Sequence, residues 1–392
     1  MKKSLYLTSA LVAASVLALG STDSMAAGKA LKVGVSGSYK AVVGYAKQAA
    51  WKTGTTSGTE HTSNNTFDVK TDSEVHFKAS GKSDSGLSIS VAIELETDQA
   101  KNSGDHIDGT SMTIGGGFGK MMLGAGGAAA VALAVGAPNT GALGAVGGDS
   151  SEWIVKPAAV GVSAVAGANI GGNDRAKIRW MSPSFSGFTA GASYVPDYTS
   201  QDNSMPDNGG NGGTDASQVD FGLKYSGKMG ANAVSASVGW WAIDQTTTAA
   251  NANSAVDGYS LGISTTMGAI TVGAGYKEVS SAGESLPTAL QGTRSLSGTA
   301  NSKDEEAVNV GAQWAQGKSA ISVNYFKNEM EKATTVDGAD SVTKWTLGYK
   351  YTMGPGIDFL GSVQNINWND EGDVPSNNNK GTAIVGGVKV AF

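Results

Sequence analysis

The strongest constraint on the fold is an alternation of apolar and polar residues that recurs along most of the chain. It is clearest in the last segment, Gly381 to Phe392 (GTAIVGGVKVAF). One phase carries Thr382, Ile384, Val388, Val390 and Phe392, and the other carries Ala383, Gly387, Lys389 and Ala391. Successive side chains of a strand point to opposite faces. The segment therefore predicts a final strand with an apolar outer face, a polar inner face and a terminal aromatic at a membrane interface.

The same alternation predicts further strands, many of them nine to fifteen residues long, which suits a tilted membrane strand. Tight turns alternate with long polar loops between them. The sixteen expected ranges are 31–45, 66–81, 87–95, 107–116, 120–125, 174–182, 187–197, 217–226, 231–243, 256–267, 269–279, 304–316, 319–331, 341–353, 356–368 and 381–392. An even number of strands with short turns at one end predicts an all-β fold, a 16-stranded antiparallel transmembrane β-barrel.

A secreted β-sandwich or β-solenoid is the soluble alternative. Aromatic residues separate the two, because a sandwich places its rings mid-strand in a core, whereas a barrel places them near strand ends as interfacial girdles. Residues of the apolar phase that lie towards strand ends are Trp240, Tyr259, Tyr276, Trp314, Tyr325, Trp345, Tyr349 and Tyr351. This distribution favours the barrel.

Residues 1–26 have the pattern of a secretory signal peptide: Lys2 and Lys3, an apolar run from Leu5 to Leu19, and the small-x-small site Ser24-Met25-Ala26. We expect cleavage after Ala26, with Ala27 as the alternative, and a barrel domain over 27–392. The formal net charge of −6 argues against nucleic acid as a partner. The chain has no cysteine, so disulfides and thiolate metal sites are excluded.

Three stretches resemble the Gram-negative general porins, particularly those of alphaproteobacterial type. Residues 116–124 (GGFGKMMLG) are similar to the glycine-rich turn between the fourth and fifth strands of that family. Residues 175–193 (RAKIRWMSPSFSGFTAGAS) are similar to its sixth strand, Ser-Pro turn and seventh strand. The last strand, ending on Phe392, is the third.

The resemblance implies a trimeric, water-filled channel of the outer membrane that passes small hydrophilic solutes and ions by diffusion. It also implies contact with outer-membrane lipid and lipopolysaccharide, and recognition of Phe392 by the barrel-assembly machinery. In such porins a long third external loop folds into the lumen, and here residues 126–173 match it. Family members commonly have more acids there and an Arg where Ala125 stands. We expect a short helix or coil against the lumen wall for Gly127 to Gly148.

Basic residues on one phase of the predicted sixth strand are candidates for the constriction. Arg175, Lys177 and Arg179 alternate with Ala176, Ile178 and Trp180. A Lys or Arg facing lipid near the bilayer midplane costs about 2–4 kcal/mol, so these three are expected to face the lumen. Lys40 and Lys70 extend the same surface. Asp149 and Glu152 on the inward loop oppose it, and together they either set a transverse field or are simply solvated lumen residues.

Catalysis and cofactor binding find little support. The histidines, His61, His76 and His106, have no metal-ligand spacing. Pairs such as Glu94 with Glu96, or Asp68 with Asp72, suit a divalent cation, although solvation in the lumen is the simpler interpretation. We therefore expect no catalytic, cofactor or metal residues. The alternative function is a non-conducting surface barrel, an adhesin or a loop-borne enzyme, since loops 199–216 and 280–303 are rich in Ser, Thr, Gly and Asn.

Overall fold

The computed structural model describes residues 31–49, 51–52, 60–61, 66–97, 107–143, 153–162, 164, 175–197, 214–247, 253–281, 302–332, 338–372 and 377–392. Within these residues the chain forms a closed antiparallel barrel and a separate two-stranded sheet, β2 (Trp51–Lys52) with β3 (Glu60–His61). The predicted signal peptide lies outside the described residues.

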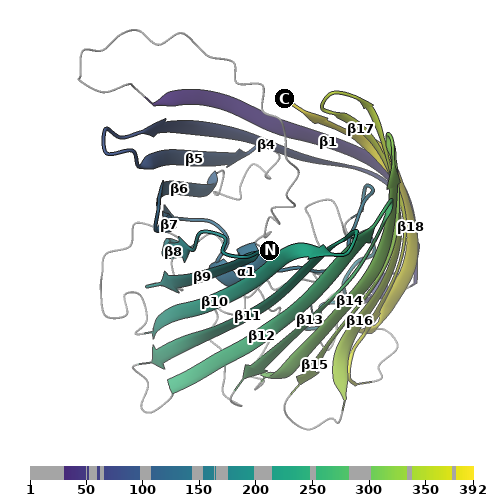
Figure 1. Ribbon diagram of the computed structural model, residues 1–392. Coiled ribbons are helices and arrows are strands. Elements are labelled where there is room, and N and C mark those ends of the chain that lie inside the picture. The colour runs from purple at the N-terminus through teal and green to yellow at the C-terminus, as the bar shows by residue number, and fades with distance from the viewer. Residues whose placement is uncertain are drawn as a thin grey trace.

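The barrel has the predicted sixteen strands, and each hydrogen-bonds to its neighbours in chain order (Figure 1). They are β1 (Lys32–Gln48), β4 (Phe67–Lys82), β5 (Ser88–Glu96), β6 (Ile107–Gly116), β7 (Gly119–Gly124), β8 (Lys177–Met181), β9 (Phe188–Val195), β10 (Thr214–Met229), β11 (Asn232–Thr247), β12 (Asn253–Met267), β13 (Ile270–Ser281), β14 (Ser302–Gln316), β15 (Ser319–Lys332), β16 (Ala339–Gly354), β17 (Ile357–Asn369) and β18 (Asn379–Ala391). Closure removes the exposed edges that an open sheet would present.

The first and last strands close the barrel. β1 pairs with β18 in a register that sets Ser38 opposite Ala391. The Phe392 N–H donates to the Gly37 carbonyl at 3.0 Å, and the Gly37 N–H donates to the Phe392 carbonyl at 2.7 Å. The terminal aromatic is therefore fixed by backbone pairing, while its ring is 55% exposed on the outer face.

Strand length divides the wall into two parts. β7 has 6 residues and β8 has 5, whereas β1 has 17 and most strands from β10 onward have 12 to 16. Tight turns with glycine at positive φ, such as Gly86 and Gly268, join strands at one end of the barrel, which we call the short-turn end. The outer face is apolar, as the alternation predicts.

Aromatic residues and charges bound the apolar band on the outer face. Phe221 and Trp240 lie in contact on β10 and β11, and Tyr325 contacts Trp345 across β15 and β16. The row of register partners that runs from Phe221 through Trp240 and Tyr259 continues with carboxylates: Glu278 lies opposite Glu306, and Glu306 opposite Glu329. Because charges are costly in hydrocarbon, this row marks where the apolar band ends. In the described part of the chain, no helix has the length and apolar character needed to cross a membrane.

Candidate functional site

The lumen contains an inner strap, residues 125–143, that runs along the wall. Its only regular element within this range is α1 (Ala129–Leu133), a single alanine-rich turn that can lie close to the strands because most of its side chains are small. Figure 1 shows α1 inside the ring of strands beside β9 and β10. Residues 127–143 of the expected range form a short helix and coil against the wall, and residues 144–148 lie outside the described residues.

Side chains of successive strands bind the backbone of the strap. In most of these bonds a strap N–H donates to a hydroxyl, carboxylate or amide oxygen of the wall. Without that oxygen the N–H would be buried and unpaired. The bonds are Ala129 N to Ser193 Oγ (2.7 Å), Ala130 N to Asp220 Oδ1 (2.8 Å), Val135 N to Ser237 Oγ (2.8 Å), Ala137 N to Asn309 Oδ1 (2.8 Å), Thr140 N to Ser322 Oγ (3.0 Å) and Ala142 N to Ser362 Oγ (2.9 Å). The strap is thus attached from β9 round to β17, and we call the inward face of these strands the strap wall.

Glycines on the strap wall let the strap backbone approach closely. A Cβ on Gly262 of β12 would overlap the carbonyl oxygen of Val135, and a Cβ on Gly348 of β16 would overlap that of Thr140. Any other residue at either position would push the strap away from the wall. Glycines of the strap wall therefore allow the strap backbone to come close, and small polar side chains accept hydrogen bonds from its N–H groups.

Two of the three predicted inward bases on β8 and just before it (Arg175, Lys177 and Arg179, here called the basic comb) hold the base of the strap. Lys177 and Arg179 point to the inner side, whereas Ile178 and Trp180 are exposed on the outer face. Lys177 Nζ donates to the Gly126 carbonyl at 2.5 Å and to the Arg175 carbonyl at 2.6 Å, and Arg179 Nη1 donates to the Gly127 carbonyl. Their orientation is as predicted, and both cations bind backbone carbonyls of the chain.

A second inner segment, 153–162, binds the wall between the strap and the start of the barrel. The Val155 N–H donates to Gln48 Oε1 of β1 at 2.9 Å, and Asn379 Nδ2 of β18 donates to the Val155 carbonyl at 2.7 Å. Lys70 Nζ lies 5.0 Å from the centre of the Trp153 ring, a cation–π contact. Asp149 and Glu152, the acids expected to oppose the comb, lie outside the described residues.

The inward faces of β1 and β4 to β7 differ from the strap wall, and we call them the cavity wall. With Arg179 and Met181 of β8 they line a cavity of about 600 Å³ near the short-turn end. Its basic side chains are Lys32, Lys82, Lys120 and Arg179. Farther along β1 and β4, Lys40 Nζ and Asp72 Oδ2 form an ion pair at 2.6 Å. Lys32 and Lys82 of the first two barrel strands thus line the cavity, whereas Lys40 is paired with a carboxylate outside it.

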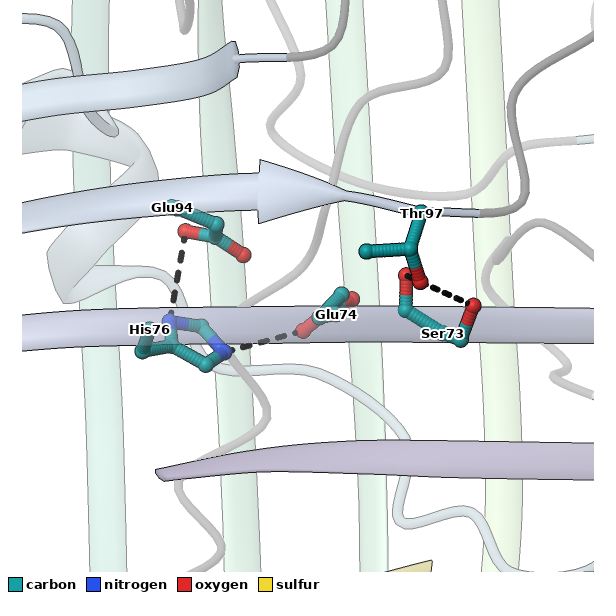
Figure 2. A network of polar contacts seen from close by, with 5 residues as sticks. All are labelled: Ser73, Glu74, His76, Glu94 and Thr97. Atoms are coloured by element: carbon teal, nitrogen blue, oxygen red, sulfur yellow. Dashed lines mark hydrogen bonds and ion pairs between the residues drawn. The ribbon is translucent and has the colours of Figure 1, made fainter. Parts of the chain in front are cut away.

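A cluster with two carboxylates lies on the cavity wall, farther from the short-turn end than the basic cavity. Figure 2 shows His76 of β4 between Glu74 of the same strand and Glu94 of β5. His76 Nε2 is 3.1 Å from Glu74 Oε2, and His76 Nδ1 is 3.9 Å from Glu94 Oε2. This cluster was missed in the sequence, where histidine spacing along the chain was the criterion. The turn at Ser83 to Gly86 could have predicted it. Residues at equal sequence distance on either side of a hairpin turn pair across the two strands, and His76 and Glu94 are equally far from Ser85.

Comparison with known proteins agrees with this geometry. The family model described as Gram-negative porin matches residues 8–371. This chain belongs to the Gram-negative porin family. It is a channel protein of the outer membrane, and the resemblance found in its sequence is confirmed. No curated protein matches this porin's sequence.

Solved porin structures share the fold at low identity. A Rhodobacter porin is 20% identical, with a TM-score of 0.58 over 92% of this chain and 100% of that chain. An anion-selective porin from Comamonas acidovorans is 15% identical, with a TM-score of 0.59 over 92% of this chain and 100% of that one. The outer-membrane channel DcaP of Acinetobacter baumannii is 12% identical, with a TM-score of 0.59 over 93% of this chain and 98% of that one.

Proposed function

We propose that ions and small hydrophilic solutes cross this porin along the cavity wall, and that the inner strap narrows the lumen from the opposite side. The observation that carries the proposal is the division of the lumen. Mostly neutral side chains, such as Ser237 and Ser322, hold the strap on one arc, while the cavity of about 600 Å³ lies on the other among charged residues. Water-filled space beside ionised side chains is what a general diffusion channel requires.

Arg179 lines the cavity at the base of the strap, with Arg175 and the buried Lys177 next to it on the same phase, and we propose that Lys40 and Lys70 on β1 and β4 extend this charged surface. We propose that their charges tune the passage of ions rather than select one solute. Along β4 the charge changes sign, from Lys82 and Lys78 near the short-turn end to Glu74 and Asp72 farther on. A permeating ion of either sign therefore meets one favourable and one unfavourable zone, so net selectivity should be modest. Asp149 and Glu152 remain candidates for the opposing charges.

The expected assembly is a homotrimer in contact with lipid and lipopolysaccharide, by analogy with porins such as Vibrio cholerae OmpT, one of whose solved structures is described as a trimer form. The short strands β7 and β8 would suit a wall covered by neighbouring subunits rather than by lipid. We expect no enzymatic activity.

Planar-bilayer recording tests the channel proposal. Purified protein should give ohmic, stepwise conductance, with steps in threes if the trimer is the conducting unit. Protein that is folded and inserted at adequate density but stays electrically silent would refute it.

Deletion of Phe392 should impair assembly, because its backbone closes β18 onto β1 and its ring is offered to the assembly machinery. The readout is the amount of folded, heat-modifiable protein in outer-membrane fractions. Phe392→Tyr is the matched control, since it keeps both the backbone pairing and an aromatic end. Normal assembly of the deletion would remove Phe392 from this role.

A further inference from the structure

We propose that the cavity wall carries a site for a divalent transition-metal ion, best suited to Zn²⁺, with His76, Glu74 and Glu94 as its protein ligands. This site goes beyond the proposed channel function, which does not require a bound metal. The inference rests on the register of β4 and β5, on the distances within the cluster and on its charge.

Register brings the ligands together. β4 and β5 pair so that His76 lies opposite Glu94, and Glu74 lies opposite Glu96. Residues two apart on a strand share a face, so all four side chains leave the same side of the hairpin. Directly opposite side chains on antiparallel strands have Cβ atoms about 4.5–5.5 Å apart. Two adjacent strands thus present a compact square of one imidazole and three carboxylates.

The distances suit a shared ion. One ligand atom each from Glu74, His76 and Glu94 can be chosen so that all three lie within 4.8 Å of one another. Zinc bonds to nitrogen and carboxylate oxygen are about 2.0–2.2 Å long, so two ligands of one tetrahedral ion lie roughly 3.3–3.6 Å apart. A small rotation of the glutamate side chains closes the remaining gap. Three protein ligands leave a fourth position for water from the lumen.

Charge supplies the driving force. Glu74 and Glu96 are like charges placed directly opposite each other, an arrangement that destabilises a strand pair. Glu94 Oε1 is enclosed and accepts no hydrogen bond from the residues that the structure describes. Lys78, the nearby cation on β4, has an exposed side chain. A divalent cation would neutralise the cluster and satisfy the enclosed oxygen.

The donor set favours Zn²⁺ over Ca²⁺ or Mg²⁺. The two alkaline-earth ions take oxygen ligands, usually six or more. Imidazole suits zinc and other first-row transition metals, and zinc also accepts the carboxylate oxygens of Asp and Glu as ligands. Because the cluster faces the lumen, an ion can reach it through water.

Isothermal titration of the folded, detergent-solubilised porin with ZnCl₂ at fixed ionic strength tests the site. We expect one Zn²⁺ per chain, with Ca²⁺ and Mg²⁺ binding at least about tenfold more weakly. His76→Gln and Glu94→Gln should each weaken Zn²⁺ binding by at least about tenfold. Asp72→Asn is the matched control: it removes a lumen carboxylate from the same face of β4 and should leave Zn²⁺ binding unchanged.

Two results would overturn the site. One is equal binding of Ca²⁺ and Zn²⁺, which would indicate unspecific attraction to carboxylates; the other is unchanged Zn²⁺ affinity in folded His76→Gln. Should the variants fail to fold, Co²⁺ added to the unaltered protein gives an independent measurement. A visible absorption band of low-symmetry Co²⁺ that Zn²⁺ abolishes supports the site, and its absence at saturating Co²⁺ opposes it. These readouts do not involve conductance, so the metal site and the channel can fail separately.

Discussion

The two arcs of the inner wall solve different problems. On the strap wall, side chains such as Ser237, Ser322 and Ser362 bind a second layer of backbone. On the cavity wall, Lys40 pairs with Asp72, and Lys82 and Lys120 line a cavity. A buried backbone needs neutral partners of small size, whereas ionised side chains need water or a counter-ion.

The difference shows how one alternating pattern yields both a scaffold and a channel. All these side chains occupy the inward phase of their strands, yet glycine, serine and asparagine beneath the strap admit its backbone, while Lys32, Lys82 and Lys120 in the same phase line the cavity. If the two arcs differ in this way, a substitution on the strap wall should have another effect than a similar substitution on the cavity wall or at a glycine of the outer face.

The largest effect is expected at the buried ion pair of the long strands. Lys277 Nζ donates to Glu305 Oε1 at 2.9 Å, and both side chains are less than one-tenth exposed (9% and 8%). Lys277→Met leaves a buried carboxylate without its cation and should lower the free energy of unfolding by about 3–5 kcal/mol. Lys40→Met breaks the cavity-wall pair, whose side chains are more exposed (15% and 16%), and should therefore cost less than Lys277→Met. Urea titrations in lipid vesicles measure both; equal losses would erase the distinction between the arcs.

A smaller loss is expected where the strap touches the wall. Gly348→Ala places a Cβ against the Thr140 carbonyl and should cost about 1–3 kcal/mol through overpacking. Gly361→Ala on the neighbouring strand is the control, since its Cβ would meet no atom closer than 4.0 Å. The same vesicle titration applies. A Gly348→Ala protein as stable as the control would mean that the strap is loosely held.

Removing one strap hydroxyl should have an effect of about 1 kcal/mol, the net value of a typical hydrogen bond. Ser322 Oγ accepts from the Thr140 N–H at 3.0 Å, so Ser322→Ala frees the strap locally and should also add fluctuations to the open-channel current. Ser90→Ala, on the cavity wall, should change neither stability nor current noise. Identical noise in the two variants would indicate that the strap does not shape the pore.

The smallest effect concerns selectivity alone. Lys120 is exposed in the cavity, so Lys120→Met should move the reversal potential in a salt gradient towards cation permeability. Lys344 is buried on β16 and donates to the Ala164 carbonyl at 2.8 Å. Lys344→Met removes the same charge and should leave the reversal potential nearly unchanged while lowering stability. A larger reversal-potential shift for Lys344→Met than for Lys120→Met would place the permeation path on the strap wall and contradict the proposal.

Much of the barrel was readable from the sequence. The strand count, the outward aromatics such as Trp345 and the inward orientation of Lys177 and Arg179 all follow from alternation, which is a property of neighbouring residues. The bonding partners of the strap were not readable, because Ala129 binds Ser193 and Ala142 binds Ser362, separated by 64 and 220 residues. A serine or glycine in the inward phase carries no mark of the backbone that will lie on it.

The sequence by itself determined that this chain closes into a membrane barrel and which side chains point inward, since the period of two is local and a one-residue slip would turn the inward charges towards lipid. Only the tertiary structure decided which inward residues meet one another. Register set His76 beside Glu94, and barrel closure brought β9 to β17 under a single strap. Such contacts depend on distances across the sheet, and no pattern within one strand records them.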